Sequence, residues 1–90
     1  MTIKKQETLI NFRKANSLIE KIEKMVESGE YCINIMQQNL AVVGLLRSAH
    51  QMLMENHLNT SFKKAMATKN EKKKQEMTQE ILRLTKLFNK

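Results

Sequence analysis

Apolar residues recur in three stretches of the chain at spacings of three or four positions, which is typical of amphipathic helices. In the first stretch, Lys14, Glu20 and Lys21 fall between the apolar positions and face the other way. The apolar positions are Leu9, Phe12, Ala15, Leu18, Ile19, Ile22, Met25 and Val26. Ser28-Gly29 predicts the end of this helix, because glycine commonly follows the last helical turn. We therefore expect a first helix over about residues 4–28.

The second stretch is the longest, and no helix-breaking residue interrupts it between about residues 31 and 67. Its stripe contains Cys32, Met36, Leu40, Val43, Leu46, Leu53 and His57. At 1.5 Å per residue such a helix is on the order of 50 Å long. A chain of 90 residues is too small to cover it, so the helix predicts a partner subunit.

The third stretch follows "TKNEKKK", a charged segment that we interpret as a solvated link. It predicts a short amphipathic helix over about residues 72–89, with apolar positions at Met77, Ile81, Leu82, Leu84, Leu87 and Phe88. The chain lacks proline, has two glycines and is rich in helix-forming residues. We expect one all-α domain over residues 1–90, with three helices per subunit and with the long second helix covered by a partner subunit.

The net charge of +7 favours a polyanionic partner, either nucleic acid or an acidic membrane face, although basic surfaces also serve solubility. The single cysteine excludes an intrachain disulfide and suits a reducing compartment. No signal peptide and no apolar run of about 20 residues is present, so we expect a cytoplasmic protein that does not enter the membrane. No paired carboxylates or phosphate-binding loop indicate an enzyme.

Cys32 and His57 share a face of the second helix, because the 25 positions between them come within about 20° of whole turns. They lie roughly 37 Å apart along the axis, so one helix cannot bring them to the same ligand. Two antiparallel copies could, with a midpoint between Gly44 and Leu45, where the helix has its one glycine. The alternative is that Cys32 is a small buried apolar residue and that His57, like His50, is structural. The methionines fit core filling.

The segment "KMVESGEYCINIMQQNLAVVGLLRSAHQMLMENHLNTSF" resembles the signature of the CsoR/RcnR family of bacterial repressors. The matching residues are Glu27, Gly29, Cys32, Gln37, Gln38, Ala41, Val42, Gly44, His57 and Leu58, and the resemblance covers roughly residues 9–88. It implies an antiparallel dimer that assembles further into a homotetramer. It also implies a repressor that binds operator DNA without inducer and releases it when a copper, nickel/cobalt, formaldehyde or persulfide signal engages the cysteine site.

The resemblance places the sensor at Cys32 and His57, with Ser61 at the third ligand position and with Tyr31 and Glu80 as supporting residues. Copper sensors of the family have a cysteine where this chain has Ser61, and nickel/cobalt sensors have a histidine there. A hydroxyl is a poor ligand for Cu(I) and a modest one for Ni(II) or Co(II). The nickel/cobalt type also has a histidine near the N-terminus, and formaldehyde sensors have a proline there; "MTIKKQ" has neither. Cu(I), or Zn(II) with help from another group, remains open, as does a reactive Cys32 thiol.

The DNA-contacting part departs from the family too, because "KANSL" at residues 14–18 retains only the basic first residue of the family's stretch. A basic face could still form from Lys4, Lys5, Arg13, Lys14, Lys21 and Arg47, with Lys63 and Lys64. The leading hypothesis is a DNA-binding repressor released by a metal ion or a thiol-reactive small molecule at an inter-subunit Cys/His site. The alternative is an oligomeric helical interaction protein of the same fold whose site no longer senses.

Overall fold

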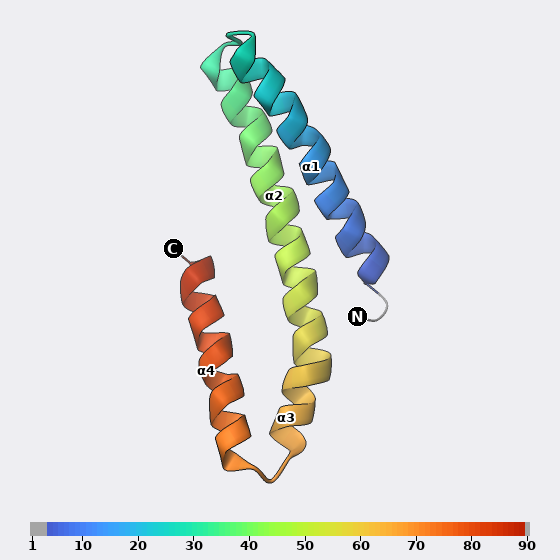
Figure 1. Cartoon of the computed structure of the whole chain (residues 1–90), viewed down its shortest axis with the longest axis vertical. Coiled ribbons are helices and arrows are strands. Elements are labelled where there is room, and N and C mark those ends of the chain that lie inside the picture. The colour runs from blue at the N-terminus through green and yellow to red at the C-terminus, as the bar shows by residue number, and fades with distance from the viewer. Residues whose placement is uncertain (1–3, 90) are drawn as a thin grey trace. The chain divides into compact units, whose positions relative to one another are not determined.

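The computed structural model describes residues 4–89 and shows four α-helices and one π-helical turn, with no strand among the described residues (Figure 1). The elements are α1 (Lys5–Glu27), α2 (Cys32–His57), η1 (Leu58–Phe62), α3 (Lys63–Ala67) and α4 (Glu71–Phe88). Because α2, η1 and α3 follow one another without a gap, the chain has three helical stretches, as predicted. The all-α fold class is confirmed, and each stretch begins and ends within one residue of its predicted bounds.

The turn from α1 to α2 shows why the first helix ends at Ser28-Gly29. Gly29 has a φ of 73°, a left-handed conformation that glycine adopts without steric cost. The amide of Gly29 donates to the Val26 carbonyl at 3.2 Å, and the amide of Glu30 donates to the Met25 carbonyl at 2.9 Å. These two bonds are the Schellman arrangement, which satisfies the last carbonyls of the helix and turns the chain back.

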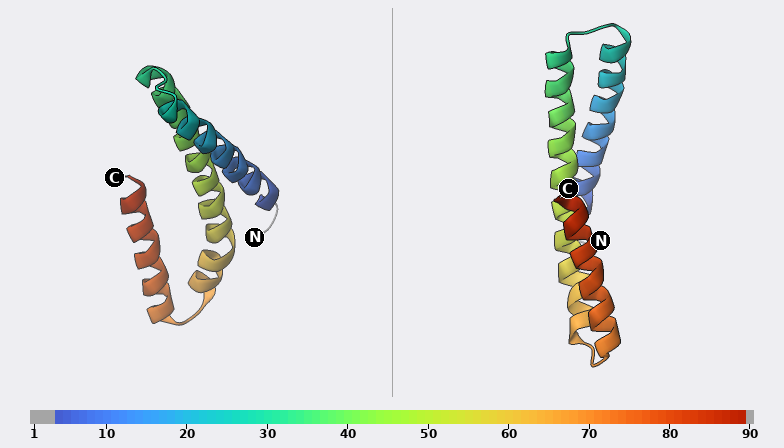
Figure 2. Two further views of the ribbon diagram at one scale, coloured as in Figure 1. Left: turned by 45° about the horizontal axis from the view of Figure 1, so that its top comes forward. Right: turned by 90° about the vertical axis from the view of Figure 1, so that its left-hand side faces the viewer.

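Residues 4–56 form one compact unit, in which α1 and α2 pack antiparallel (Figures 1 and 2). The start of α1 meets the end of α2: Lys4 Nζ pairs with Glu55 Oε2 at 2.8 Å, and Thr8 Oγ1 lies 3.5 Å from Met52 Sδ. The Thr8 hydroxyl also bonds the Lys4 carbonyl at 2.8 Å. Ala15, Val42 and Ala49 are buried between the helices, so small side chains make the contact.

The apolar residues of α2 occupy two faces. Val42 and Ala49 face α1 and are buried, with Ile35, Leu45 and Met52 half-buried at the same helical spacing. Most of the predicted stripe lies away from α1 and is exposed: Met36 is 58% and Leu40 is 67% exposed, whereas His57 is half-buried. One helix of this unit therefore covers only one of the two apolar faces of α2.

Residues 57–89 form the second compact unit, which contains η1, α3 and α4. The second helical stretch was predicted as uninterrupted, but residues 58–62 are π-helical. Single π turns inside α-helices are rare, and those that occur are often at functional sites. No glycine or proline marks this one, so the pattern of residues carries no signal for it.

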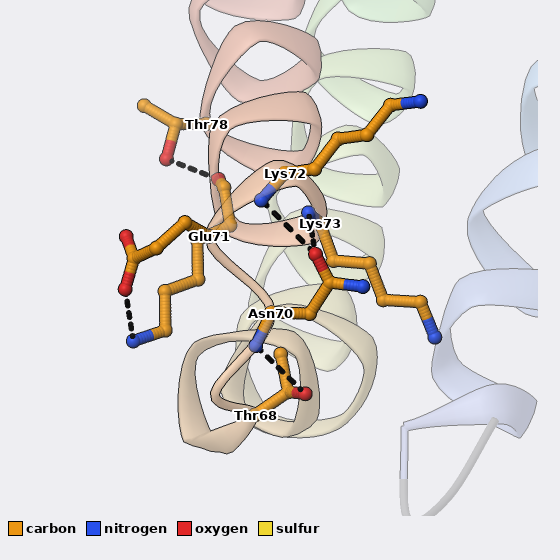
Figure 3. Close-up of polar contacts among 7 residues, drawn as sticks. Thr68, Asn70, Glu71, Lys72, Lys73 and Thr78 are labelled. Carbon is orange, nitrogen blue, oxygen red and sulfur yellow. Dashed lines mark hydrogen bonds and ion pairs between the residues drawn. The ribbon is translucent and has the colours of Figure 1, made fainter.

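The turn before α4 is shorter than the predicted solvated link (Figure 3). Asn70 caps the helix: its Oδ1 accepts bonds from the amides of Lys72 and Lys73 at 3.1 and 3.2 Å. The Thr68 hydroxyl in turn accepts a bond from the Asn70 amide at 3.3 Å. The "KKK" run is thus already in the first turns of α4, where cations oppose the helix dipole and where Asn70 and Glu71 offset them. That the two units make one domain stays a prediction.

Candidate functional site

Cys32 is the first residue of α2, and its thiol is exposed. Tyr31, just before it, is 68% exposed, and its carbonyl accepts bonds from the amides of Asn34 and Ile35 at 3.0 and 3.3 Å. These bonds fix the first turn of α2. Within its own subunit the thiol therefore stands exposed at a defined helix end.

His57 is the last residue of α2 and is half-buried. Its Nε2 lies 3.2 Å from Sδ of Met77, which is on α4 and is also half-buried. Because α2 has 26 residues, Cys32 and His57 lie roughly 37 Å apart along its axis. Within one subunit they cannot bind one ion. Among residues 4–89, no three His, Cys, Asp or Glu side chains come together as a possible metal group.

Ser61 lies in η1 and is exposed. It lines a hollow of about 390 Å³ together with Lys64, Ala65, Thr68 and Lys73. Two lysines and no acidic residue line this hollow, a charge balance that disfavours a bound cation because like charges repel. The surroundings of Ser61 thus agree with the poor ligand chemistry of its side chain.

Glu80 is exposed on α4 and lines a second hollow, of about 430 Å³, together with Lys72, Gln75, Glu76, Gln79 and Arg83. Its supporting role stays a prediction, as does that of Tyr31. Met77 is a side chain that contacts His57. In the sequence, Met77 is simply one of the apolar positions of the third helix. A thioether at helical spacing looks like core filling in any sequence, so only the path of the chain between His57 and Met77 could have revealed the contact.

The exposed face of α2 also bears on assembly. Ile33, Met36, Leu40 and Val43 lie on it, and all are more than two-fifths exposed. Gly44 lies there too, and a Cβ built on it would meet nothing within 4 Å. A glycine costs a helix roughly 1 kcal/mol relative to alanine. Among residues 4–89 no atom lies close enough to that Cβ to require a glycine, which suits close approach by another chain.

The basic residues are divided unevenly between the two units. Residues 57–90 contain nine Lys or Arg and three Glu, which gives a net charge of +6. Residues 1–56 contain seven Lys or Arg and six Glu, which gives a net charge of +1. Lys5, Arg13, Lys14, Lys21 and Arg47 are exposed, and their part in a basic face stays a prediction. Lys4 is also exposed, but the hydrogen bond to Glu55 and its charge raise the pKa of the Lys4 ammonium, so one carboxylate already balances it.

A family model described as "Metal-sensitive transcriptional repressor" matches residues 4–90. The chain belongs to this metal-sensitive repressor family. It is 35% identical over 66 residues to the copper-sensing transcriptional repressor CsoR of Mycobacterium ulcerans (strain Agy99), covering 73% of this chain and 56% of that protein. It is 33% identical, with the same coverage, to the CsoR of Mycobacterium tuberculosis (strain ATCC 25618 / H37Rv).

The chain thus spans about half the length of the curated relatives it matches. No solved structure gives a significant match. Family membership confirms the resemblance found in the sequence, and it agrees with the prediction that the chain is not an enzyme. Over residues 4–89, none of the helices combines the length and the apolar character needed to cross a bilayer.

Proposed function

We propose that this chain represses transcription by binding operator DNA as an oligomer, and that a soft metal ion at an inter-subunit Cys32–His57 site releases the DNA. Family membership supports the general activity. The observation that carries the site is the position of the two donors: they stand at opposite ends of α2, on the side that bears its exposed apolar face.

A two-fold, antiparallel pair of α2 helices would cover this face and bring each thiol to His57 of the partner subunit. The midpoint of Cys32 and His57 falls beside Gly44, where the backbone is uncovered. Symmetry would form the site twice. This pairing would bury the exposed apolar residues Ile33, Met36, Leu40 and Val43. Burial of apolar surface is the main favourable term in most protein association.

A thiolate and an imidazole suit Cu(I) better than they suit Ni(II) or Co(II), with Zn(II) between them. The copper-sensing relatives support the same choice. When bound, the ion would link the end of one α2 to the start of the other. Release of DNA then requires the ion to favour the conformation that does not bind DNA, since a ligand shifts an equilibrium only by its difference in affinity for the two states.

The DNA surface would combine the expected residues of α1 and α2 with the lysines around the α3–α4 turn, where most of the net charge lies. Lys–phosphate contacts give affinity that falls steeply with salt. The sequence shows no recognition helix of the helix-turn-helix kind, so the shape of the DNA would contribute to the choice of operator.

The test uses the full chain and a labelled duplex selected by the metal-free protein from a random pool. We expect the metal-free protein to bind the duplex and anaerobic Cu(I) to weaken that binding, while Cys32→Ala and His57→Gln bind DNA normally but ignore Cu(I). His50→Gln is the matched histidine control and should respond like the natural protein. A Cys32→Ala variant that still responds to Cu(I) would remove Cys32 from the sensor.

One observation favours the second candidate, an oligomer of the same fold that no longer senses. Ser61, at the family's third ligand position, stands beside Lys64 and Lys73 and is unsuited to a cation. This candidate predicts Cu(I) binding no tighter than that of an ordinary surface thiol and no release of DNA by Ni(II), Co(II), Zn(II), formaldehyde or persulfide. The same titrations separate the two functions.

A further inference from the structure

The side chain of Met77 is in contact with the imidazole of His57, one of the two proposed ligands. Nε2 of the imidazole and Sδ of Met77 are 3.2 Å apart, and both side chains are half-buried within the unit of residues 57–89. A metal ion bound through Nε2 would therefore have a thioether sulfur close by. The contact joins the end of α2 to the second turn of α4.

A thioether is a soft, polarisable donor that carries no proton, and soft sulfur ligands are those that select Cu(I). The hydroxyl of Ser61 is a hard donor, and it faces a hollow lined by Lys64 and Lys73. Of the two side chains, Met77 is the one that both touches His57 and has suitable chemistry.

We propose that Met77 supplies the third donor of a Cu(I) site, with His57 of the same subunit and Cys32 of the partner subunit, in place of a ligand at position 61. This inference rests on the proposed function. The ordinary alternative is that the imidazole N–H simply donates a weak hydrogen bond to sulfur in the metal-free protein. The two are compatible, because that proton leaves when Nε2 binds a metal.

The donor set has a consequence for selectivity. Replacing Met77 with leucine removes a soft donor while retaining an apolar side chain of similar volume, a change that cores usually tolerate. Cu(I) affinity should fall by about tenfold or more, at least as much as loss of a supporting residue at a metal site usually costs. Affinity for Ni(II), which prefers imidazole and harder donors, should be unchanged.

The matched control is Met66→Leu, since Met66 is another half-buried methionine of the same unit. Anaerobic competition with a Cu(I) chelator gives the affinities, and X-ray absorption at the copper edge counts sulfur neighbours. We expect two sulfur neighbours in the natural protein and in Met66→Leu, and one in Met77→Leu. Labelling the unmutated protein with selenomethionine should place one selenium beside copper, which tests the site without a substitution that could disturb folding.

The outcomes distinguish this inference from the function it rests on. If Cu(I) binds through Cys32 but Met77→Leu keeps its affinity and no selenium neighbour appears, Met77 is not a ligand and the proposed function stands. If the natural protein binds Cu(I) no better than Cys32→Ala does, both proposals fail.

Discussion

The two compact units of the chain differ in what stabilises them and in what they carry. Residues 4–56 have the buried residues of the structure, with Ala15, Val42 and Ala49 between two long helices, and nearly balanced charge. Residues 57–89 have no buried residue in η1, α3 or α4, and residues 57–90 carry a net +6. Under the proposed function, the first unit would serve pairing, and the second would supply charge for DNA together with the Met77–His57 contact.

The largest effect is expected from the lysines around the α3–α4 turn, because each substitution recurs in every copy of an oligomer. Replacing Lys69, Lys72 and Lys73 with glutamine halves the net charge of residues 57–90, from +6 to +3. DNA affinity should fall, and the slope of log affinity against log salt should flatten by about 0.9 for each phosphate that the protein no longer neutralises. Fluorescence anisotropy over a salt series measures both.

The matched control replaces Arg13, Lys14 and Lys21 of α1, which removes the same charge from the other unit. We expect the substitutions at the turn to leave folding intact, because cations near a helix N-terminus oppose its dipole. If replacing Arg13, Lys14 and Lys21 weakens DNA binding more than replacing the lysines of the turn does, the DNA surface belongs to residues 4–56 instead.

The next largest effect concerns the contact between α1 and α2. Ala49 is fully buried, so Ala49→Leu overpacks the helix interface and should lower the free energy of unfolding by about 1–3 kcal/mol. Ala41 is exposed on the same helix, and Ala41→Leu should be nearly neutral. Denaturant unfolding followed by circular dichroism measures the difference. Equal stability of the two variants would show that the buried contact is not what stabilises the first unit.

A smaller effect is expected at the start of α4. Asn70→Ala removes the side-chain oxygen that accepts bonds from the amides of Lys72 and Lys73, a loss of about 1 kcal/mol. Asn70→Asp keeps the acceptor and should restore most of that stability. Amide hydrogen exchange should show faster exchange in the first turn of α4 for the alanine variant alone. Faster exchange in α1 as well would mean that the units do not respond separately.

The smallest effect is expected from the exposed Lys4–Glu55 pair. Lys4→Met should change thermal stability little more than Lys5→Met does, because exposed ion pairs contribute little. The pKa of Lys4 is raised, so its contribution is complete below its ordinary value of 10.5 and is lost only as the pH rises through the higher folded value. Unfolding scans between about pH 6 and 9 should therefore show no transition from this ammonium. A transition in this pH range that Lys4→Met abolishes would contradict this expectation.

Much of the fold could be predicted from the sequence, because it depends on local signals. The spacing of apolar residues predicted the helices, and Ser28-Gly29 predicted the turn at a position that needs a positive φ. The π turn at residues 58–62 was not predicted, and neither was the helical conformation of the "KKK" run, which was interpreted as part of a solvated link. The first has no marker residue, and the second places three lysines where the helix dipole disfavours them.

The candidate site stays a prediction. Periodicity puts Cys32 and His57 on one face of one helix, and the family resemblance then favours them as ligands. Met77 could not be proposed in this way, because its contact with His57 depends on where the chain returns after Thr68 and Asn70. The same limit applies to Ser61, whose neighbours Lys64 and Lys73 come from two different helices.

Under the proposed function, the apolar character of both faces of α2 would link the abundance of the protein to its regulatory state. If copies cover the outer face of α2 for one another, mass action makes the melting temperature rise with protein concentration. A cell that dilutes the repressor below its dissociation constant would then lose repression without any inducer, simply by growing faster than it synthesises new chains.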